Sequence, residues 1–160
     1  MTTSTGSTLN EKMAELLRTL DRVVSRLAAI QQTPRAYGTN AQLYSTEIHT
    51  IQAIGDVANA TVTRLAKRMG VTKGAVSQTV AKLASKRLVR KRAVPGNARE
   101  VRIELTDLGR IAYRSHEAFD RKILSAIEAH CGADTERMVD LYLKVLRDFE
   151  AILRLHSEAS

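Results

Sequence analysis

The chain has 160 residues, the size of one domain, and 44% of them are hydrophobic, which is enough to form a core. A single cysteine excludes an internal disulfide and fits a reducing compartment, and no apolar stretch is long enough to span a membrane. Eight glycines and two prolines leave few turns, so we expect a mainly helical protein.

The net charge of +8 is distributed unevenly along the chain. Residues 64–102 contain 12 Lys or Arg and one acidic residue, which leaves +11. The rest of the chain has 13 basic and 16 acidic residues, which leaves −3. A solvated basic face is the alternative explanation of such a run. We expect this segment to face the phosphates of nucleic acid.

The N-terminal part begins with a polar tract and continues as a helix. Residues 1–8 are rich in Ser, Thr and Gly, so we expect a disordered tail, no signal peptide and a cytoplasmic location. In residues 9–33 apolar residues recur at alternating steps of four and three: Leu9, Met13, Leu16, Leu20, Val23, Leu27 and Ile30. This repeat predicts a long helix that packs on another long helix. Pro34 ends it, and a second helix, ending at Gly55, carries Ile48, Ile51 and Ile54.

Two short helices joined by a tight turn are predicted between Thr61 and Leu83. Thr61 caps the first helix, whose apolar positions are Val62, Leu65, Ala66 and Met69. Gly70 supplies the left-handed residue that stops it. Val71 is expected to be buried, and Thr72 caps the second helix. The inner face of the second helix is formed by Val76, Val80 and Leu83.

The opposite face of the second helix is slim and polar, so it can enter the major groove of DNA. We predict that Lys73 and Gln78 lie at the groove floor with Ser77, since Gln can pair with adenine and Lys can reach guanine. Thr61 and Thr72 are expected to contact phosphates, although capping alone accounts for both. The predicted DNA-binding residues are Thr61, Thr72, Lys73, Gly74, Ser77, Gln78, Lys82, Arg90, Arg92 and Arg99.

Residues 88–105 predict a β-hairpin, which we call the wing. A basic run and a turn cluster are followed by apolar residues that alternate with polar ones: Val101, Ile103 and Leu105. Arg99 and the run Arg90–Arg92 are expected to reach the minor groove or flanking phosphates. A two-stranded hairpin is unstable alone, so the wing must pack on the helices.

Two more helices are predicted after the wing. Thr106 caps the first, Asp107 lies at its positive end, and its apolar stripe is Leu108, Ile111, Ala112, Phe119, Ile123 and Ile127. It ends near Cys131. Asp134 or Thr135 starts the last helix, which repeats the steps of four and three: Met138, Tyr142, Val145, Phe149 and Ile152.

The helices at 9–33 and 107–157 have seams that one small winged helix could not cover. We therefore predict that they form a two-fold dimer, with a winged helix-turn-helix DNA-binding region at 43–105 and one domain overall. Such a dimer would read two half-sites about one helical turn apart, in a near-palindromic operator.

In this order of elements the chain resembles the MarR family (multiple antibiotic resistance regulators) over roughly residues 9–155. The resemblance is carried by Leu65-Ala66, by Val71-Thr72-Lys73-Gly74-Ala75-Val76-Ser77-Gln78 and by Leu105-Thr106-Asp107-Leu108-Gly109. It implies a mainly α fold with a small β-hairpin wing. It also implies an obligate dimer that usually represses transcription and releases DNA when a small molecule, oxidant or metal binds.

Two positions depart from the family pattern. Asn97 stands where the wing commonly has Asp in Asp-x-Arg, so it brings no charge to steady Arg99. Arg87 stands where Gly usually precedes the first strand. A left-handed Arg87 would cost roughly 1 kcal/mol or more. Either the helix ends differently, or the strain is accepted for another phosphate contact.

The sharpest hypothesis for an effector is a zinc or other divalent metal site made of His49, His116 and Asp120. His116 and Asp120 are four residues apart on one helix, a spacing that can present two ligands to one ion. The two histidines also look like those of zinc-responsive MarR members. Late in the first helix, however, Gln31 and Gln32 offer no acidic partner. The alternative is a hydrogen-bonded, interfacial histidine pair.

Two further effector hypotheses stay open. Cys131, beside His130, is either an oxidation sensor or an ordinary half-buried cysteine. A small organic effector could bind between the dimer helices and the reading head. It would touch one of three tyrosines that packing alone also explains: Tyr37, Tyr44 and Tyr113.

The sequence has no GxxxxGK loop, nucleotide fingerprint, HExxH or GxSxG motif, so we do not expect an enzyme. We predict a sequence-specific double-stranded DNA-binding transcriptional regulator that acts as a homodimer. Its predicted role is a repressor released by a small-molecule, metal or redox signal. The alternative is a non-sequence-specific architectural DNA-binding protein.

Overall fold

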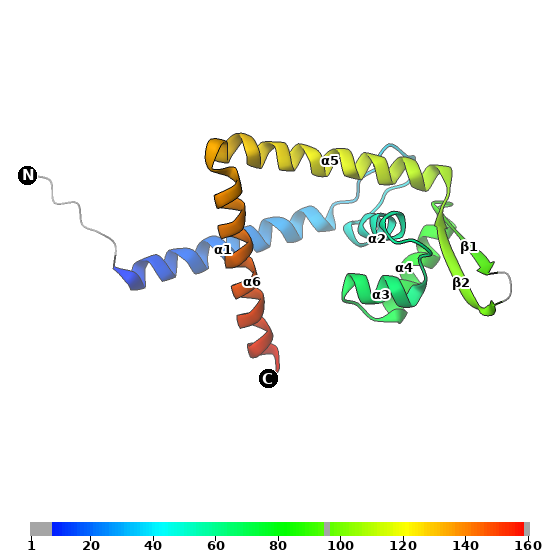
Figure 1. Ribbon diagram of the computed structural model, residues 1–160, viewed down its shortest axis with the longest axis horizontal. Helices are drawn as coiled ribbons and strands as arrows, with labels where there is room; N and C mark the ends of the chain where they lie inside the picture. The colour runs from blue at the N-terminus through cyan, green and yellow to red at the C-terminus, as the bar shows by residue number, and fades with distance from the viewer. Residues whose placement is uncertain (1–7, 95–96, 159–160) are drawn as a thin grey trace, which may run out of the picture. The chain divides into compact units, whose positions relative to one another are not determined.

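The computed structural model describes residues 8–94 and 97–158, and it describes side chains over 8–93 and 101–155. The predicted tail lies outside the described residues except for Thr8. The described elements, in chain order, are α1 (Leu9–Gln32), α2 (Ser45–Asp56), α3 (Val62–Met69), α4 (Lys73–Ser85), β1 (Val89–Val94), β2 (Asn97–Leu105), α5 (Asp107–Cys131), η1 (Gly132–Asp134) and α6 (Thr135–Glu158). The predicted fold class, mainly α with a two-stranded wing, is confirmed (Figure 1).

The chain divides into two compact units, Met1–His116 and Glu117–Ser160. No helix in the described part of the chain is long and apolar enough to cross a membrane. The core of the first unit is built from α2, α3, α4 and the wing, whose fully buried side chains include Ile48, Ile51, Leu65, Val80, Leu83 and Leu88. The buried side of α4 is part of this core, which fixes the position of the helix.

The helix-turn-helix forms as its caps predict. The hydroxyl of Thr61 accepts a hydrogen bond from the Arg64 amide at 3.3 Å, and that of Thr72 accepts one from the Ala75 amide at 3.2 Å. Gly70 ends α3 in the left-handed conformation, with φ at 66°. The prediction that Val71 is buried is wrong, because 44% of it is exposed. Its amide closes the end of α3 onto the Ala66 carbonyl, and the turn leaves the side chain outside the core.

The end of α2 also differs from the prediction. Gly55 is not a terminator, because α2 continues through Asp56 and is closed by the Val57 amide on the Ala53 carbonyl. A Cβ on Gly55 would lie 2.4 Å from the ring of Tyr113. This glycine therefore permits close packing of α5 on α2 instead of a turn.

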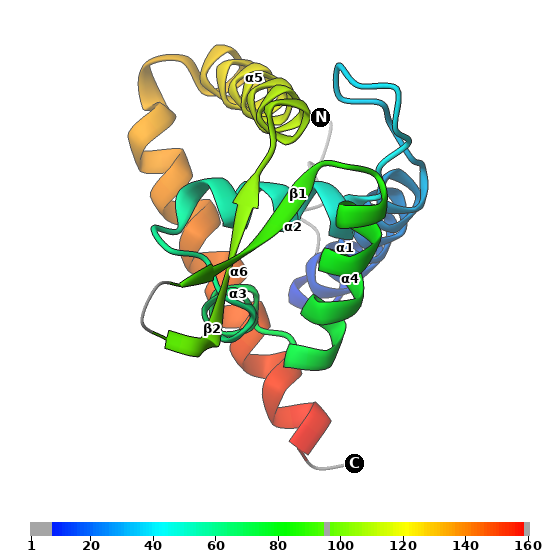
Figure 2. The ribbon, with the colours of Figure 1, turned by 90° about the vertical axis from the view of Figure 1, so that its right-hand side faces the viewer.

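The wing is an antiparallel hairpin that packs beside α4 (Figure 2). Ile103 and Leu105 face the core, and the Ile103 amide donates to the Ala60 carbonyl at 2.8 Å, which ties β2 to the start of the helix-turn-helix. Val101 has the same alternation but is 43% exposed, since the hairpin has passed the edge of the core there. The alternation predicted the face of Val101 but not its burial.

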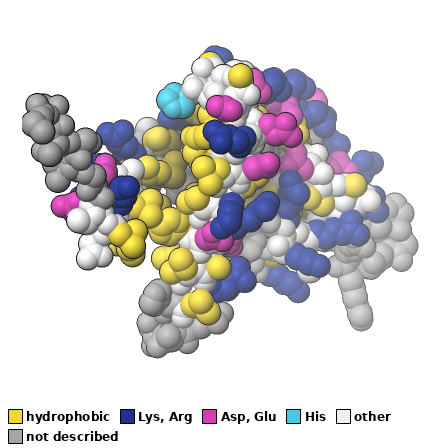
Figure 3. Space-filling view, turned by 60° about the vertical axis from the view of Figure 1, so that its left-hand side comes forward, with side chains coloured by type: hydrophobic (Ala, Val, Ile, Leu, Met, Phe, Trp, Pro, Cys, Tyr) yellow, Lys and Arg dark blue, Asp and Glu magenta, His cyan; other side chains and the backbone are white. Residues whose placement is uncertain are grey.

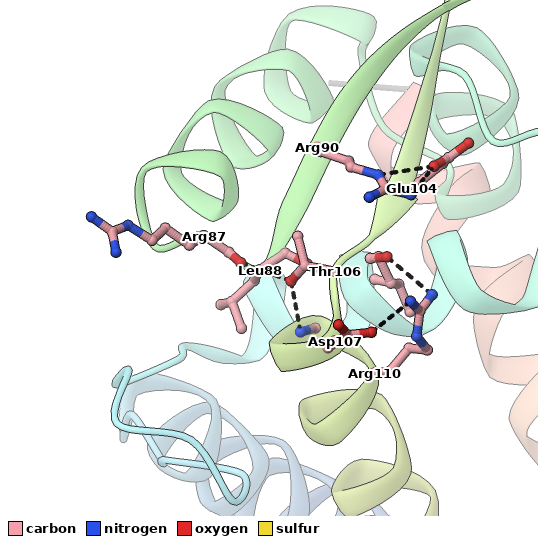
Figure 4. Close-up of polar contacts among 9 residues, drawn as sticks. Arg87, Leu88, Arg90, Glu104, Thr106, Asp107 and Arg110 are labelled. Carbon is pink, nitrogen blue, oxygen red and sulfur yellow. Dashed lines mark hydrogen bonds and ion pairs between the residues drawn. The ribbon is translucent and has the colours of Figure 1, made fainter.

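The junction of α4, the wing and α5 explains two features of the sequence (Figure 4). Arg87 adopts a φ of 60°, so α4 ends in the left-handed conformation despite the missing glycine. The hydroxyl of Thr106 donates to the Arg87 carbonyl at 2.7 Å and accepts from the Gly109 amide at 3.1 Å. A Cβ on Gly109 would lie 2.0 Å from the Leu88 carbonyl oxygen. The Thr106–Gly109 motif thus seats α5 directly on the end of α4.

The two terminal helices expose their apolar seams. No residue of α1 is buried, and none of residues 135–155 of α6 is. Several large apolar side chains of α1 are at least half exposed, including Leu9, Met13, Leu16, Leu17 and Leu27. On α6, the seam residues Tyr142, Val145 and Ile152 are 38–50% exposed. Leu141, Leu146, Leu153 and Leu155, outside the seam, are at least half exposed. Exposed apolar side chains are visible as yellow surface in Figure 3.

Candidate nucleic-acid interface

The two faces of α4 differ as predicted. Val76, Val80 and Leu83 are at most 2% exposed and fix the helix on the core. The opposite side is exposed along the length of the helix, at Lys73, Gly74, Ala75, Ser77, Gln78, Ala81 and Lys82. It carries small, amide, hydroxyl and ammonium groups and no large apolar side chain. This surface, which we call the α4 face, is slim enough to enter a major groove.

The N-terminal ends of α3 and α4 place hydroxyl groups beside free backbone amides. Thr61 and Thr72 both act as helix caps, so the structural part of their predicted role is confirmed. A capping hydroxyl that accepts a backbone hydrogen bond retains its own proton to donate. Contact of these hydroxyls with phosphate stays a prediction.

The wing holds Arg90 and Arg92 against a carboxylate that the sequence analysis did not single out. Arg90 donates through Nε and Nη2 to Oε2 of Glu104, at 3.0 and 2.9 Å (Figure 4). Arg92 Nη1 lies 3.7 Å from Oε1 of the same carboxylate. The hydrogen bond from Arg90, and then the charges of both arginines, lower the pKa of Glu104. Both guanidinium side chains are still more than half exposed.

This ion pair could have been found from the strand register. Arg90 and Glu104 are directly opposite each other in the hairpin, where opposite charges stabilise the pairing. The charge of Glu104 orients these two arginines. Asn97 stands where the family commonly has an aspartate, and it has no charge with which to do the same. The side chain of Arg99 lies outside the described residues, so its predicted contact is untested.

A partly buried ion pair fixes the C-terminal end of α4. Nζ of Lys86 lies 2.6 Å from Oε1 of Glu47 on α2 and 2.8 Å from the Gln42 carbonyl. The Glu47 side chain is 5% exposed, and its Oε2 accepts from the Tyr44 amide at 2.9 Å. A carboxylate buried to this extent requires such partners. The pair therefore holds the orientation of α4 relative to α2.

A second polar link connects α3 to α5 through α2. Asp56 accepts from Arg68 at 2.7 Å and from the hydroxyl of Tyr113 at 2.9 Å. With its ring against Gly55 and its hydroxyl on Asp56, Tyr113 has a packing role. The alternative that this tyrosine contacts an organic effector is not required to explain its position.

The histidines predicted as metal ligands are brought together only in part. The rings of His49 and His116 have centroids 5.4 Å apart at an angle of 34°, and Tyr37 contacts His116 edge-on at 5.6 Å. Asp120 follows His116 by four residues on α5. Over the described part of the chain, no three His, Cys, Asp or Glu side chains gather as metal ligands. Two imidazoles are fewer than the three or four protein ligands that zinc takes, so the residues present do not fit a complete site.

Comparison with known proteins gives consistent matches. A sequence profile of the MarR family matches residues 41–100. The chain is 28% identical over 112 residues to the uncharacterized HTH-type transcriptional regulator YhjH of Bacillus subtilis. That match covers 70% of this chain and 64% of the relative, so the chain spans under two thirds of the relative's length.

Two solved structures illustrate the similarity of the fold. FabT of Streptococcus pneumoniae, crystallised in complex with DNA, has a TM-score of 0.70 at 22% identity, covering 90% of this chain and 99% of that one. ZitR of Lactococcus lactis, a zinc-responsive MarR family member, has a TM-score of 0.69 at 18% identity, covering 85% and 96%. The long N- and C-terminal helices and the winged helix-turn-helix are therefore those of a known fold.

Proposed function

We propose that the chain is a MarR-family transcriptional regulator, not an enzyme, and that it acts by binding specific double-stranded DNA. In this proposal the α4 face lies in the major groove, and the wing lies against the minor groove or the neighbouring phosphates. The proposed contacts are those predicted from the sequence, with Lys73, Ser77 and Gln78 at the base edges.

One observation carries the proposal: the exposed side of α4 is polar and narrow while the rest of the helix is fixed in the core. A helix that only filled space would not require small residues at Gly74, Ala75 and Ala81. The segment that contains this face is strongly basic, since residues 64–102 hold 12 of the 25 basic residues of the chain. A related fold crystallised with DNA, that of FabT, supports the same use of the surface.

The proposed assembly is a homodimer held by α1, the outer part of α5 and α6. The apolar seams of α1 and α6 are open to solvent, and a protein rarely leaves apolar patches of this extent uncovered. A second copy of the chain would cover both seams and carry a second α4 face. Two faces related by a two-fold axis fit a near-palindromic operator.

Repression and its release are the finer part of the proposal. A dimer on an operator would block access to the promoter, and a bound effector would lower the affinity for DNA. The predicted metal role of His49, His116 and Asp120, and the predicted oxidation of Cys131, stay alternatives for that effector. Cys131 is half-buried, which is compatible both with an oxidation sensor and with an ordinary cysteine.

The test is the binding of duplexes selected by the protein from a random pool, measured by fluorescence anisotropy. We expect Gln78→Ala to weaken binding and to change which bases are preferred, because the amide reads a base edge. Arg99→Ala is expected to weaken binding without changing the preference, since a wing contact to phosphate carries no base information. Gln32→Ala on α1 is the matched control.

Two results would contradict this proposal. If Gln78→Ala left affinity and base preference unchanged, the α4 face would not be the reading surface. If unrelated duplex DNA competed as well as the selected duplex, the protein would be an architectural DNA-binding protein.

A further inference from the structure

The glycines of the described part of the chain fall into two groups, and Gly74 belongs to neither. Three glycines adopt a positive φ, and two leave no room for a Cβ, which would lie 2.4 and 2.0 Å from neighbouring atoms. The first group is Gly38, Gly70 and Gly132, and the second is Gly55 and Gly109. Backbone conformation or close packing therefore accounts for both groups.

Gly74 lies in the first turn of α4, in helical conformation and exposed to solvent. Its φ is not among the positive values, so any L-residue could adopt this backbone conformation. Among the described atoms, a Cβ at this position would meet the hydroxyl oxygen of Thr72 at an ordinary contact distance of 3.8 Å. Glycine stabilises a helix less than alanine does. The fold alone would therefore favour alanine at position 74.

The missing side chain leaves a gap beside Gln78. Gln78 follows Gly74 by four residues, so the two residues are neighbours on the exposed side of α4. Long side chains on a helix lean toward its N-terminus, over the residues three and four positions before them. For Gln78 these residues are Ala75 and Gly74, which are both exposed and both small. The amide of Gln78 therefore has room to lie flat over the first turn of α4.

An alanine at position 74 would place a methyl group in this gap and displace the amide of Gln78. A glutamine amide binds adenine through two hydrogen bonds, to N6 and N7 of the base, so both bonds depend on the placement of one planar group. Hydrogen bonds weaken steeply as their angle departs from linearity. A displaced amide would therefore lose the bidentate contact, although the glutamine itself is unchanged.

We propose that Gly74 is a positioning residue for base recognition, because its missing side chain leaves the space in which the Gln78 amide binds the major-groove edge of an adenine. Gly74 acts through Gln78 and not through a base contact of its own. The inference rests on the proposed function, in which the α4 face lies in the major groove. It adds a second residue on which the base preference of that face depends.

The test is a double-mutant cycle on the full chain, with the wild type, Gly74→Ala, Gln78→Ala and the double variant. The probe is the duplex that the wild type selects from a random pool, and binding is measured by fluorescence anisotropy. We expect Gly74→Ala to weaken binding at least about fivefold and to lose the preference for the same base pair that Gln78→Ala loses. In the Gln78→Ala background, Gly74→Ala should change the affinity by less than about twofold, because the amide that it positions is absent.

Two controls separate base recognition from folding. Urea unfolding should show that Gly74→Ala is at least as stable as the wild type, because α4 gains a better helix former. Ser25 lies on α1 outside its apolar seam and is exposed. Ser25→Ala also places alanine at an exposed helical position, and it should leave both the affinity and the base preference unchanged.

Three results would overturn this inference alone. Wild-type affinity and base preference in Gly74→Ala, together with impaired binding by Gln78→Ala, would show that DNA does not require the glycine. An equal loss of affinity with and without the Gln78 side chain would mean that Gly74 contacts DNA by itself. A Gly74→Ala variant that is less stable in urea would mean that the fold requires the glycine.

Failure of the proposed function would give a different pattern. Gln78→Ala would then bind the duplex like the wild type and select the same bases, and the inference about Gly74 would fail with it.

Discussion

Replacing Arg87 with glycine separates the backbone strain at the end of α4 from the charge of the side chain. Arg87 has a φ of 60°, and its carbonyl accepts a hydrogen bond from Thr106 at 2.7 Å, so the junction requires this conformation. Arg87→Gly removes the strain and the guanidinium group together. Arg87→Ala removes the guanidinium group and keeps the strain, which makes it the matched control.

The expected gain in stability is small but measurable. A left-handed conformation costs an L-residue roughly 1–2 kcal/mol, and glycine recovers this. Glycine also loses about 0.4–1 kcal/mol through the larger entropy of the unfolded chain. The net effect of Arg87→Gly is a gain of about 0.5–1 kcal/mol, or about 1–4 °C in Tm for a chain of this length. Arg87→Ala should change stability by less than about 0.5 kcal/mol.

Urea unfolding at one protein concentration measures the stabilities, and anisotropy at several salt concentrations measures DNA binding. If the strain is retained for a phosphate contact, both variants lose affinity equally and their log–log salt slope falls by about 0.9. A glycine variant no more stable than the alanine variant would refute the strain argument. Unchanged DNA binding by both variants would refute the phosphate contact.

Three more predictions follow from single contacts. Gly109→Ala should cost about 2–3 kcal/mol, because its Cβ would lie 2.0 Å from the Leu88 carbonyl oxygen. Gly74→Ala, whose Cβ would meet the Thr72 hydroxyl oxygen at an ordinary contact distance of 3.8 Å, should not destabilise the protein to urea. Glu104 has a lowered pKa, so its contribution to stability is complete above the usual value of 4.5 and is lost as the pH falls through the lowered pKa. Glu104→Gln should therefore be less stable than the wild type at pH 7, and melting curves should converge in acid; a constant difference would contradict this. If His116 is a metal ligand, the wild type binds zinc stoichiometrically and His116→Ala does not. Zinc titrations that give the same result for both proteins would exclude this role.

Local rules predicted most of the fold. Thr61, Thr72 and Thr106 cap helices as their sequence positions indicate, because capping depends on residues three apart in the chain. The buried and exposed sides of α4 follow from the helical period alone. Local patterns could not show where the core ends, so Val71 was wrongly expected to be buried.

Contacts between distant residues were the part that sequence could not supply. Glu47 and Lys86 are 39 residues apart, and the sequence around either residue does not indicate that they form an ion pair. Only the strand register shows that Arg90 lies opposite Glu104 and that Arg102 lies opposite Arg92. The histidine pair was correctly expected to be close, but spacing on one helix could not tell whether a third ligand would join it.

The proposed function depends most on two α4 faces reading one duplex. The direct measurement is selection of DNA from a random pool by the wild-type protein, followed by sequencing. We expect an inverted repeat whose half-sites are about 10–10.5 base pairs apart, centre to centre. A pool that retains no common sequence after selection, although the protein binds it, would contradict the claim.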